Sequence, residues 1–323
     1  MYYYKRLKRN LIDFYKTRIL AKHYKKNFVS DSINSKYYIY MCDGKIHHGG
    51  LADRLHGIVS TYAYCKEFNK DFKIYYTYPY NLKEFLLPNK YNWEITKEEL
   101  IYDKNIAKPV LISRRQSVKE QKKLAKKLLE NTKSQTHVYT NMKYDYDNNF
   151  KFLFKELFKP SKYLSDAIKE QQNLLNKNYI SITFRFQQLL GDFKEGNFPI
   201  IKNNQERINL INNCKKFIEY VHNENQEIEK ILVTSDSITF LNYISDINYV
   251  YTIPGRIIHM DYNGKDENLS VHLKSFLDLF MIANAKKIYS VVYPPLFHSG
   301  FPFLASLING NEYIEVSDFH INK

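Results

Sequence analysis

The sequence predicts an α/β protein with two doubly wound parallel sheets. Short apolar segments of strand length alternate along the chain with longer segments of helical periodicity, as in parallel sheets that are covered by helices. The alternation occurs in two series that meet between Pro160 and Tyr179, and a chain of 323 residues has room for two domains. We therefore expect a basic N-terminal segment over residues 1–30, a first domain over 31–175 and a second over 176–323, with the domains facing a cleft.

The first series begins with a strongly apolar strand at Lys36–Cys42. A helix is predicted at Leu51–Phe68, where apolar residues recur every three or four positions. The helical pattern from Phe150 to Asn176 is interrupted at Pro160, because a proline ring cannot continue a helix interior. Further strands are predicted at Lys73–Tyr78, Val110–Ser113 and His137–Thr140.

The second series opens with a strand at Tyr179–Phe186 that is apolar except for one arginine. In folds of this class, ligands bind beyond the carboxyl ends of the strands, so the residues that follow each strand are the candidates for chemistry. The other strands are predicted at Ile231–Thr234, Tyr249–Ile253 and Lys287–Val292, and the helices at Gln205–Val221, Ile238–Ile244, Val271–Ala285 and Phe301–Ile308.

The composition narrows the class of protein. The 29 Tyr, 21 Phe and 1 Trp exclude a disordered chain, and 3 scattered cysteines exclude a disulfide scaffold. No apolar run reaches transmembrane length and no secretory signal is visible, so we expect a cytoplasmic protein. Asp145 and Asp147 form a DxD pair of the kind that holds a metal in some transferases, but roughly one such pair is expected by chance. We therefore predict no metal.

The basic charge is concentrated in two segments. The chain has 48 Lys and Arg against 34 Asp and Glu, a net charge of +14, and nine of the basic residues lie in the first 26. Leu7, Leu11 and Phe14 share one side of a helix there, which fits either contact with an anionic membrane surface or a solvated helix packed on the protein. The run Lys119–Lys127 has the spacing of an ordinary amphipathic surface helix. Nucleic-acid binding is disfavoured, because no zinc spacing, RNP-like strand or GxxG clamp occurs.

The first candidate site is the turn Asp43–Leu55 (DGKIHHGGLADRL), which follows a strand and opens a helix. Gly49 and Gly50 allow the backbone to turn tightly and to approach a ligand. The helix N-terminus and Arg54 suit a phosphate, and Asp53 adds an acceptor. The turn matches neither GxGxxG nor GxxxxGK[ST], so it predicts neither a dinucleotide fold nor a P-loop. A tight turn with Asp53 as a partner of the helix dipole explains the same residues.

The second candidate site follows the strand that contains Arg185. An arginine at the end of a buried strand is costly unless it meets an anion. That anion is either a carboxylate of this chain, Asp192 or Glu195, or a phosphate of a ligand, which an arginine binds through two hydrogen bonds.

The third candidate site combines three segments of the second series. Asp236 follows a predicted strand, and Asp278 lies in a predicted helix. Ser299, Gly300 and Phe301 form the entrance of the last helix, where Ser299 serves as a cap or where a nucleotide phosphate binds.

Together these motifs resemble those of the GDP-fucose-dependent fucosyltransferases of GT-B fold, which include bacterial α-1,2- and α-1,6-fucosyltransferases and protein O-fucosyltransferases. Gly49–Leu55 (GGLADRL) is similar to their GLGNRL-type turn. Thr183–Arg185 with Gly191–Phe193 is similar to their HxRxGD(F/Y) motif, in which the arginine holds the donor diphosphate. Here Thr183 replaces the histidine, and Gln187–Leu190 are additional residues between the two halves.

The later segments continue the resemblance, which covers roughly residues 36–310. Val233–Ser237 (VTSDS) resembles the family's TDS turn. Asp278 with Ser299–Phe301 resembles its late D…SxF segment, which lies near the guanine and the phosphates.

The resemblance implies a GT-B-like fold with two Rossmann-like domains, the first on the acceptor side and the second for the nucleotide sugar. It implies inverting transfer of L-fucose from GDP-fucose to a sugar hydroxyl of a bacterial surface glycan, without a metal. The basic N-terminus fits an acceptor carried on a lipid at the inner membrane face. The donor is expected to contact Gly49, Gly50, Arg54, Arg185, Asp236, Asp278, Ser299, Gly300 and Phe301. The candidate bases for the acceptor hydroxyl are Asp192, Glu195 and Asp53, in that order, with His48 as a weaker fourth.

Two other functions stay open on the sequence. One is a glycosyltransferase that uses another nucleotide sugar, and the other is a nucleotide- or nucleic-acid-binding protein without catalysis. A strand-end arginine that is followed by carboxylates favours the enzyme, because a binding protein has no need of that combination.

Overall fold

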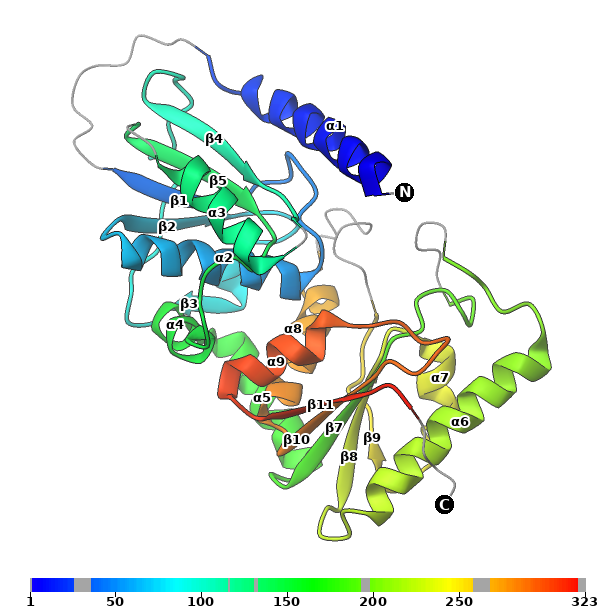
Figure 1. Ribbon diagram of the computed structural model, residues 1–323. Coiled ribbons are helices and arrows are strands. Elements are labelled where there is room, and N and C mark those ends of the chain that lie inside the picture. Colours follow the sequence, from blue (N-terminus) through cyan, green and yellow to red (C-terminus); the bar gives the residue numbers. More distant parts are fainter. Residues whose placement is uncertain are drawn as a thin grey trace. The chain divides into compact units, whose positions relative to one another are not determined.

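The computed structural model describes residues 2–25, 36–115, 117–130, 133–192, 198–257 and 268–318, and it divides into two compact units (Figure 1). The first unit runs to Lys159, and the described residues from Pro160 onward form the second. Each unit has its own parallel sheet, so the predicted α/β class is confirmed. Among the helices of these ranges, none is long and apolar enough to cross a membrane.

The first unit contains a four-stranded parallel sheet in the order β2-β1-β5-β4. The two central strands are β1 and β5. The chain continues from β1 to β2 on one side, whereas β5 pairs with β4 on the other side, so the strand order reverses between β1 and β5. The strands are β1 (Tyr37–Cys42), β2 (Asp71–Tyr76), β4 (Ala107–Ile112) and β5 (Gln135–Thr140).

Helices cover both faces of this first sheet. On one face, Tyr38 of β1 donates a hydrogen bond to the carbonyl of Leu129 in α3 (2.8 Å), and α2 packs directly on β5. A Cβ on Gly57 of α2 would lie only 2.6 Å from the carbonyl oxygen of Thr140, so this close packing requires a glycine. On the other face, α1 contributes to a buried apolar cluster of Leu20, Ile39, Met41 and Tyr139. The helices are α1 (Tyr2–Ala21), α2 (Leu51–Glu67) and α3 (Val118–Leu129).

The end of α1 is fixed to the sheet by a buried histidine. The side-chain carbonyl oxygen of Gln135 accepts a hydrogen bond from the backbone N–H of Ile101, so His137 Nε2, 3.0 Å away, must be the donor to it. Nδ1 of His137 is then the acceptor for the hydroxyl of Tyr24, at 2.5 Å. Burial lowers the pKa of His137 to about 3, which keeps the ring neutral and this connection intact.

Two short strands, β3 (Leu86–Pro88) and β6 (Phe158–Pro160), pair with each other near the end of the first unit. The helical pattern is broken at Pro160 as predicted, and it is divided into α4 (Phe150–Leu157) and α5 (Lys162–Leu175). The first unit ends at Lys159, whereas the boundary was expected at residue 175, because α5 packs on α8 (Ser270–Asn284), a helix of the second unit.

The second unit contains a five-stranded parallel sheet in the order β11-β10-β7-β8-β9. Counted in chain order from β9, this is 3-2-1-4-5, the arrangement of doubly wound nucleotide-binding folds, and the order reverses between β7 and β10. The sequence did not predict β11, the last strand along the chain. The strands are β7 (Tyr179–Phe184), β8 (Lys230–Ser235), β9 (Val250–Tyr251), β10 (Lys287–Val291) and β11 (Glu312–Val316).

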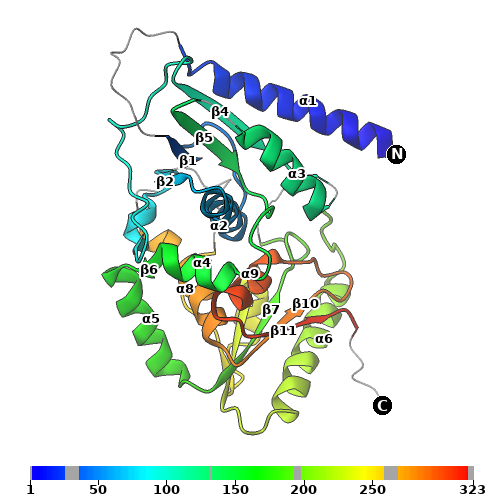
Figure 2. The ribbon, with the colours of Figure 1, turned by 60° about the vertical axis from the view of Figure 1, so that its left-hand side comes forward.

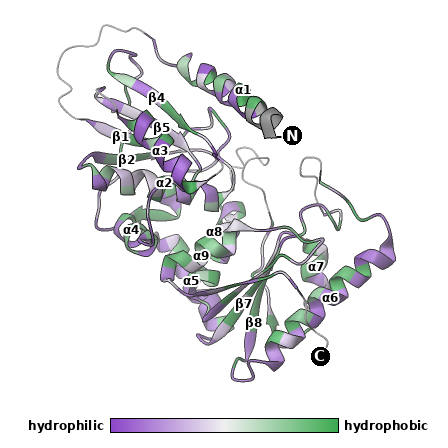
Figure 3. Ribbon diagram, viewed as in Figure 1, coloured by the Kyte–Doolittle hydropathy of each residue, from purple (hydrophilic) through white to green (hydrophobic). Residues whose placement is uncertain are grey.

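Helices lie on both faces of the second sheet, and Figure 2 shows α6 on one side with α5 and α8 on the other. Alternate residues of β7, Ile180 and Ile182, join the buried core under α6, and hydrophobic residues continue along this strand in Figure 3. On the opposite face, Tyr179 donates a hydrogen bond to the carbonyl of Met281 in α8 (2.6 Å). The remaining helices are α6 (Asn204–Asn223), α7 (Ile238–Tyr243), α8 (Ser270–Asn284) and α9 (Gly300–Asn309).

Candidate active site

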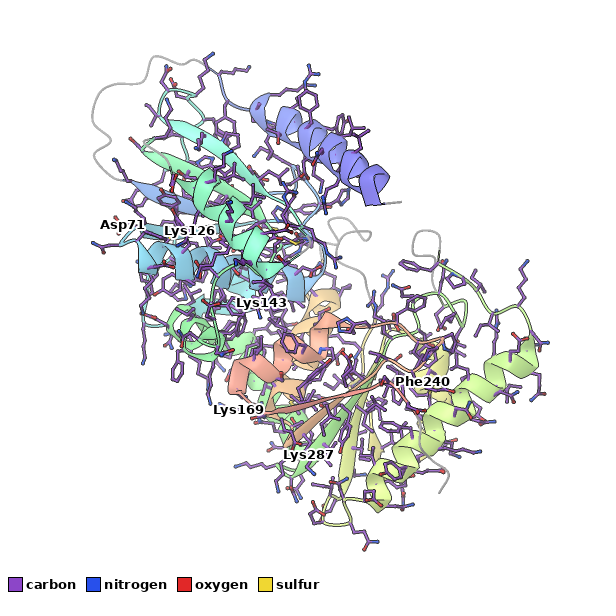
Figure 4. The ribbon with its side chains drawn as sticks, viewed as in Figure 1. Asp71, Lys126, Lys143, Lys169, Phe240 and Lys287 are labelled. Carbon is purple, nitrogen blue, oxygen red and sulfur yellow. The ribbon has the colours of Figure 1, made fainter. Side chains whose placement is uncertain are left out.

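Arg185 directly follows β7, at the point where the strand order of the second sheet reverses. Its neighbours Phe184 and Phe186 are buried, and the rings of both lie 4.9 Å from the ring of Phe240 on α7, which is labelled in Figure 4. This packing fixes the backbone on both sides of Arg185. The arginine side chain itself is 26% exposed, so the strand end holds it rigidly while leaving part of it accessible.

Asp236, which follows β8, positions the loop that contains Arg185. Its carboxylate accepts hydrogen bonds from the backbone N–H groups of Phe186 (2.7 Å) and Gln187 (2.9 Å), and it lies 3.7 Å from Nη1 of Arg185. Burial raises the pKa of Asp236, against the lowering effect of Arg185 and these N–H groups. Both of its oxygens hold the protein's own loop, and the expectation that Asp236 contacts the donor stays a prediction.

Sequence reasoning did not identify Asp236 as the partner of Arg185. The register of the sheet pairs Phe184 with Ser235, so the next residues along the two parallel strands are Arg185 and Asp236. The signal was present in the sequence, because each residue follows its own predicted strand directly. The carboxylate found beside Arg185 is that of Asp236, which was not one of the two expected, Asp192 and Glu195.

Asp192, the first candidate for the base, lies at the start of α7. Its carboxylate accepts hydrogen bonds from the hydroxyls of Ser237 and Thr239 and from the backbone N–H of Thr239 (3.1 Å). A carboxylate at a helix N-terminus is stabilising, so helix capping explains this residue. The expectation that Asp192 is the leading base stays a prediction beside this capping role. The second candidate, Glu195, lies outside the described residues.

The N-terminus of α9 lies at the same edge of the sheet as Arg185, because β10, α9 and β11 form a parallel crossover. The backbone N–H of Phe297 donates to the carbonyl of Arg185 (2.9 Å), which connects the loop before α9 to the end of β7. Ser299 caps the helix by accepting from the N–H of Phe301 (3.3 Å). A Cβ on Gly300 would meet nothing within 4 Å, so the first turn of α9 is open to a ligand.

Asp278 lies on α8 and forms an ion pair with a buried lysine. Nζ of Lys274 is 2.9 Å from each of its carboxylate oxygens. Burial raises the pKa of Asp278, whereas Lys274 lowers it. Lys274 was not among the predicted site residues, although its spacing of four residues on one helix is a recognisable signal for such a pair. The expected contact of Asp278 with a donor stays a prediction.

The glycine turn of the first unit is built around Arg54. Nε of Arg54 donates to the carbonyl of Gly49 (2.9 Å), which has a left-handed backbone at φ +78°. Nη1 lies within hydrogen-bond distance of Cys42 Sγ (3.1 Å), the hydroxyl of Tyr76 (3.0 Å) and the carbonyl of Tyr78 (2.8 Å). Only 1% of Arg54 is exposed. Burial commits its guanidinium to the fold, and the expectation that Arg54 binds a ligand stays a prediction.

The other residues of this turn have different surroundings. A Cβ on Gly50, which precedes α2, would meet nothing within 4 Å, and Asp53 is exposed in the first turn of the helix. The expectation that Gly49, Gly50 and Asp53 meet a ligand stays a prediction. The fourth candidate base, His48, is buried, and its ring centroid lies 6.0 and 6.1 Å from those of Tyr40 and Tyr139.

The two aspartates of the DxD pair, Asp145 and Asp147, contact a lysine of the first unit. Nζ of Lys122 on α3 is 2.8 Å from a carboxylate oxygen of Asp145 and 3.4 Å from one of Asp147. Both carboxylates are thus ion-paired with the same lysine. In the part of the chain that the structure describes, no three His, Cys, Asp or Glu side chains are arranged to hold a metal ion.

The solved structures that this chain resembles in fold include fucosyltransferases. The fucosyltransferase NodZ from Bradyrhizobium matches with a TM-score of 0.53 and 13% identity, over 85% of this chain and 93% of its own. A mutant of FUT1 from Arabidopsis thaliana in complex with GDP matches with a TM-score of 0.56 and 9% identity, over 95% and 76%. This chain shares the fold of these fucosyltransferases.

These matches cover most of the chain, so the similarity in fold is not confined to one segment. NodZ α-1,6-fucosyltransferase soaked with GDP-fucose matches over the same 85% of this chain, with a TM-score of 0.52 and 12% identity. Neither a protein-family model nor a curated protein matches this sequence. The predicted GT-B-like α/β fold is confirmed by structural similarity at identities too low for sequence comparison to detect.

Proposed function

We propose that this protein is an inverting glycosyltransferase that transfers L-fucose from GDP-fucose to a hydroxyl group of a glycan. The observation that carries the proposal is the cationic edge of the second sheet, where Arg185 and the open N-terminus of α9 lie together in a fucosyltransferase fold. NodZ was soaked with GDP-fucose and the FUT1 mutant is in complex with GDP, which supports a guanine nucleotide as the ligand.

In this reaction the acceptor oxygen attacks the anomeric carbon while the bond from that carbon to the diphosphate breaks. GDP leaves with the electron pair, and its diphosphate gains negative charge in the transition state. Arg185 and the N–H groups at the start of α9 are preorganised to stabilise that charge. Asp236 acts as a positioning residue for Arg185. The arginine and the helix terminus supply positive charge of the kind that a divalent ion supplies elsewhere, so no metal is proposed.

The proton of the acceptor hydroxyl passes to a carboxylate. The candidates for this carboxylate are Asp192, Glu195 and Asp53, in that order.

A thermal-shift panel of GDP, UDP, CDP, ADP, GDP-fucose and GDP-mannose tests the donor. We expect GDP and GDP-fucose to stabilise the protein selectively, by about 2.7 kcal/mol at 100 times the dissociation constant. A shift with UDP or CDP alone would retain the glycosyltransferase and reject the fucose donor. If no nucleotide stabilises the folded protein, the proposed site is wrong. Release of GDP from GDP-fucose on addition of a glycan acceptor distinguishes the enzyme from a nucleotide-binding protein.

We further propose that the acceptor is a surface polysaccharide or O-antigen under assembly in the cytoplasm, and that α1 contacts the inner membrane face there. The orientation of α1 supports this contact, because between residues 7 and 16 charged side chains lie on its sheet side and apolar ones are exposed, the reverse of an ordinary surface helix. The side chains that pack toward the sheet include Arg9, Asp13 and Lys16. The outward stripe consists of Leu7, Leu11, Phe14 and Tyr15, which are 54%, 62%, 62% and 67% exposed. Basic residues along the helix complement an anionic surface.

The double variant Leu7→Ser/Phe14→Ser tests the membrane contact. We expect its partition onto vesicles with anionic lipid to fall by about tenfold or more, because two apolar side chains no longer enter the interface. Co-sedimentation measures the bound fraction. Phe152→Ser is the control, since Phe152 on α4 is also an exposed apolar residue of the same unit, at 71%. Equal losses for the control and the double variant, or equal binding of the wild-type protein to uncharged vesicles, would contradict the proposal.

A further inference from the structure

We propose that the first unit binds a lipid phosphate, with its phosphate or diphosphate group in a cationic cavity and its hydrocarbon chain along the adjacent apolar groove. The cavity has a volume of about 200 Å³. It lies between α1 and the carboxyl ends of β1, β4 and β5, where the strand order of the first sheet reverses. Such reversal points are where α/β sheets bind ligands. The inference rests on the proposed function and names the carrier of its acceptor.

The lining of the cavity has an excess of positive charge. Arg9 and Lys16 line it from α1, and Arg114 lines it from the end of β4. The carboxylate that also lines it, Asp13, is already engaged by Nη1 of Arg115 at 3.2 Å and by the hydroxyl of Ser113. Three cationic side chains therefore line the cavity, and its one acidic side chain, Asp13, is paired with Arg115, which is not among the lining residues. A group with two or more negative charges complements that lining.

Arg9 shows most directly that an anion is expected. Its Nε is buried, and within the described ranges it has no hydrogen-bond partner. A buried donor of a charged group that is left unsatisfied is costly, and such groups are rare in folded proteins. The amide of Asn141 and the exposed His47 line the same space and add polar groups around an oxyanion. A phosphate at this position would satisfy the buried Nε.

An apolar groove of about 530 Å³ adjoins this cavity and shares Lys16, Ile46 and His47 with it. The rest of the groove is largely apolar and is lined by Leu11, Ile12, Tyr15, Ile19 and Lys45. A cationic cavity that continues into an apolar groove matches a ligand with an anionic head and a hydrocarbon tail. The outward stripe of the same helix faces the proposed membrane surface, so a lipid has a short path to the groove. These features favour a lipid phosphate over free inorganic phosphate.

Calorimetric titration tests the cavity with inorganic diphosphate, in the presence of saturating GDP so that the proposed donor site is filled. We expect Arg9→Gln and Arg114→Gln each to weaken diphosphate binding by at least about tenfold, or about 1.4 kcal/mol. Arg18→Gln is the matched control, because Arg18 lies on the exposed side of α1 with its guanidinium 5.6 Å from the ring of Phe14. Wild-type affinity in both Arg9→Gln and Arg114→Gln, or no binding by the wild-type protein, would overturn the proposal.

A second titration identifies the source of the phosphate. A water-soluble short-chain prenyl diphosphate is expected to bind at least about tenfold more tightly than inorganic diphosphate. Ile12→Asp should remove that advantage while leaving inorganic diphosphate unaffected, because Ile12 lines the groove and not the cavity. Equal affinities for the two ligands in the wild-type protein would reject the lipid. Measurement of GDP affinity separates this proposal from the proposed function. Arg9→Gln should bind GDP as tightly as the wild-type protein does. If the wild-type protein does not bind GDP, the proposed donor site is rejected.

Discussion

Arg185→Ala is expected to weaken GDP binding by about a hundredfold and to abolish transfer from GDP-fucose. An arginine holds a phosphate through hydrogen bonds between charged groups, which contribute about 1.5–3 kcal/mol each, so the loss of the fork removes at least two decades of affinity. The fold should survive, because Phe184 and Phe186 anchor the strand end through Phe240 and the arginine side chain is partly exposed. Calorimetry with GDP and a GDP-release assay measure the two effects.

Two further variants make this test specific. Lys287→Ala removes a cation from the start of β10, at the opposite edge of the same sheet, and should leave GDP binding unchanged (Figure 4). Arg185→Lys keeps the charge without the planar fork and should give an intermediate affinity. Normal GDP binding by Arg185→Ala would show that the diphosphate lies elsewhere, and a similar loss in Lys287→Ala would indicate a general effect of charge.

The strand before Arg185 was predictable because its signal lies in consecutive residues of the sequence. An apolar run of strand length that ends in an arginine indicates both a buried strand and an anion nearby, and the structure contains both. The alternation of strands and helices likewise predicted the two parallel sheets, since the faces of each strand must be covered. The expected site at the carboxyl edge follows from that topology alone.

The roles of individual carboxylates were not predictable, because they depend on partners that are distant in the sequence. Asp192 is held by Ser237 and Thr239, and no periodicity or spacing relates these residues to it. The division at Lys159 depends on the packing of α5 on α8, which is also a long-range contact. β11 escaped prediction because its side chains are only partly buried, so its sequence lacks the apolar run of a central strand.

Arg54 shows how a residue pattern can indicate a ligand and yet serve the fold. An arginine in the first turn of a helix after two glycines suits a phosphate, and the sequence gives no sign of the strand end and loop that enclose it. The structure places its guanidinium among Cys42, Tyr76 and the carbonyl of Tyr78, where it fixes the glycine turn from within. A structural and a ligand-binding role predict different consequences for the same substitution.

Arg54→Ala is expected to lower the unfolding free energy of the protein by about 3 kcal/mol or more. The substitution leaves a cavity and deprives the carbonyls of Gly49 and Tyr78 of a donor in a buried site, and each unsatisfied group adds about 1–3 kcal/mol. Urea denaturation measures the change. The control is Arg115→Ala, because Arg115 is more exposed and pairs with Asp13 near the surface, so its loss should amount to about 1 kcal/mol or less.

The two roles of Arg54 separate when stability and binding are measured on the same variant. If the buried guanidinium serves the fold, Arg54→Ala loses stability, and GDP binding by whatever protein remains folded is retained, because Arg185 and the start of α9 lie in the other unit. If Arg54 instead contacts a ligand, the variant keeps wild-type stability and loses GDP affinity. A variant with Arg54→Met restores most of the side-chain volume but none of the hydrogen bonds. A large loss of stability in that variant as well would assign the effect to the unsatisfied carbonyls rather than to the cavity.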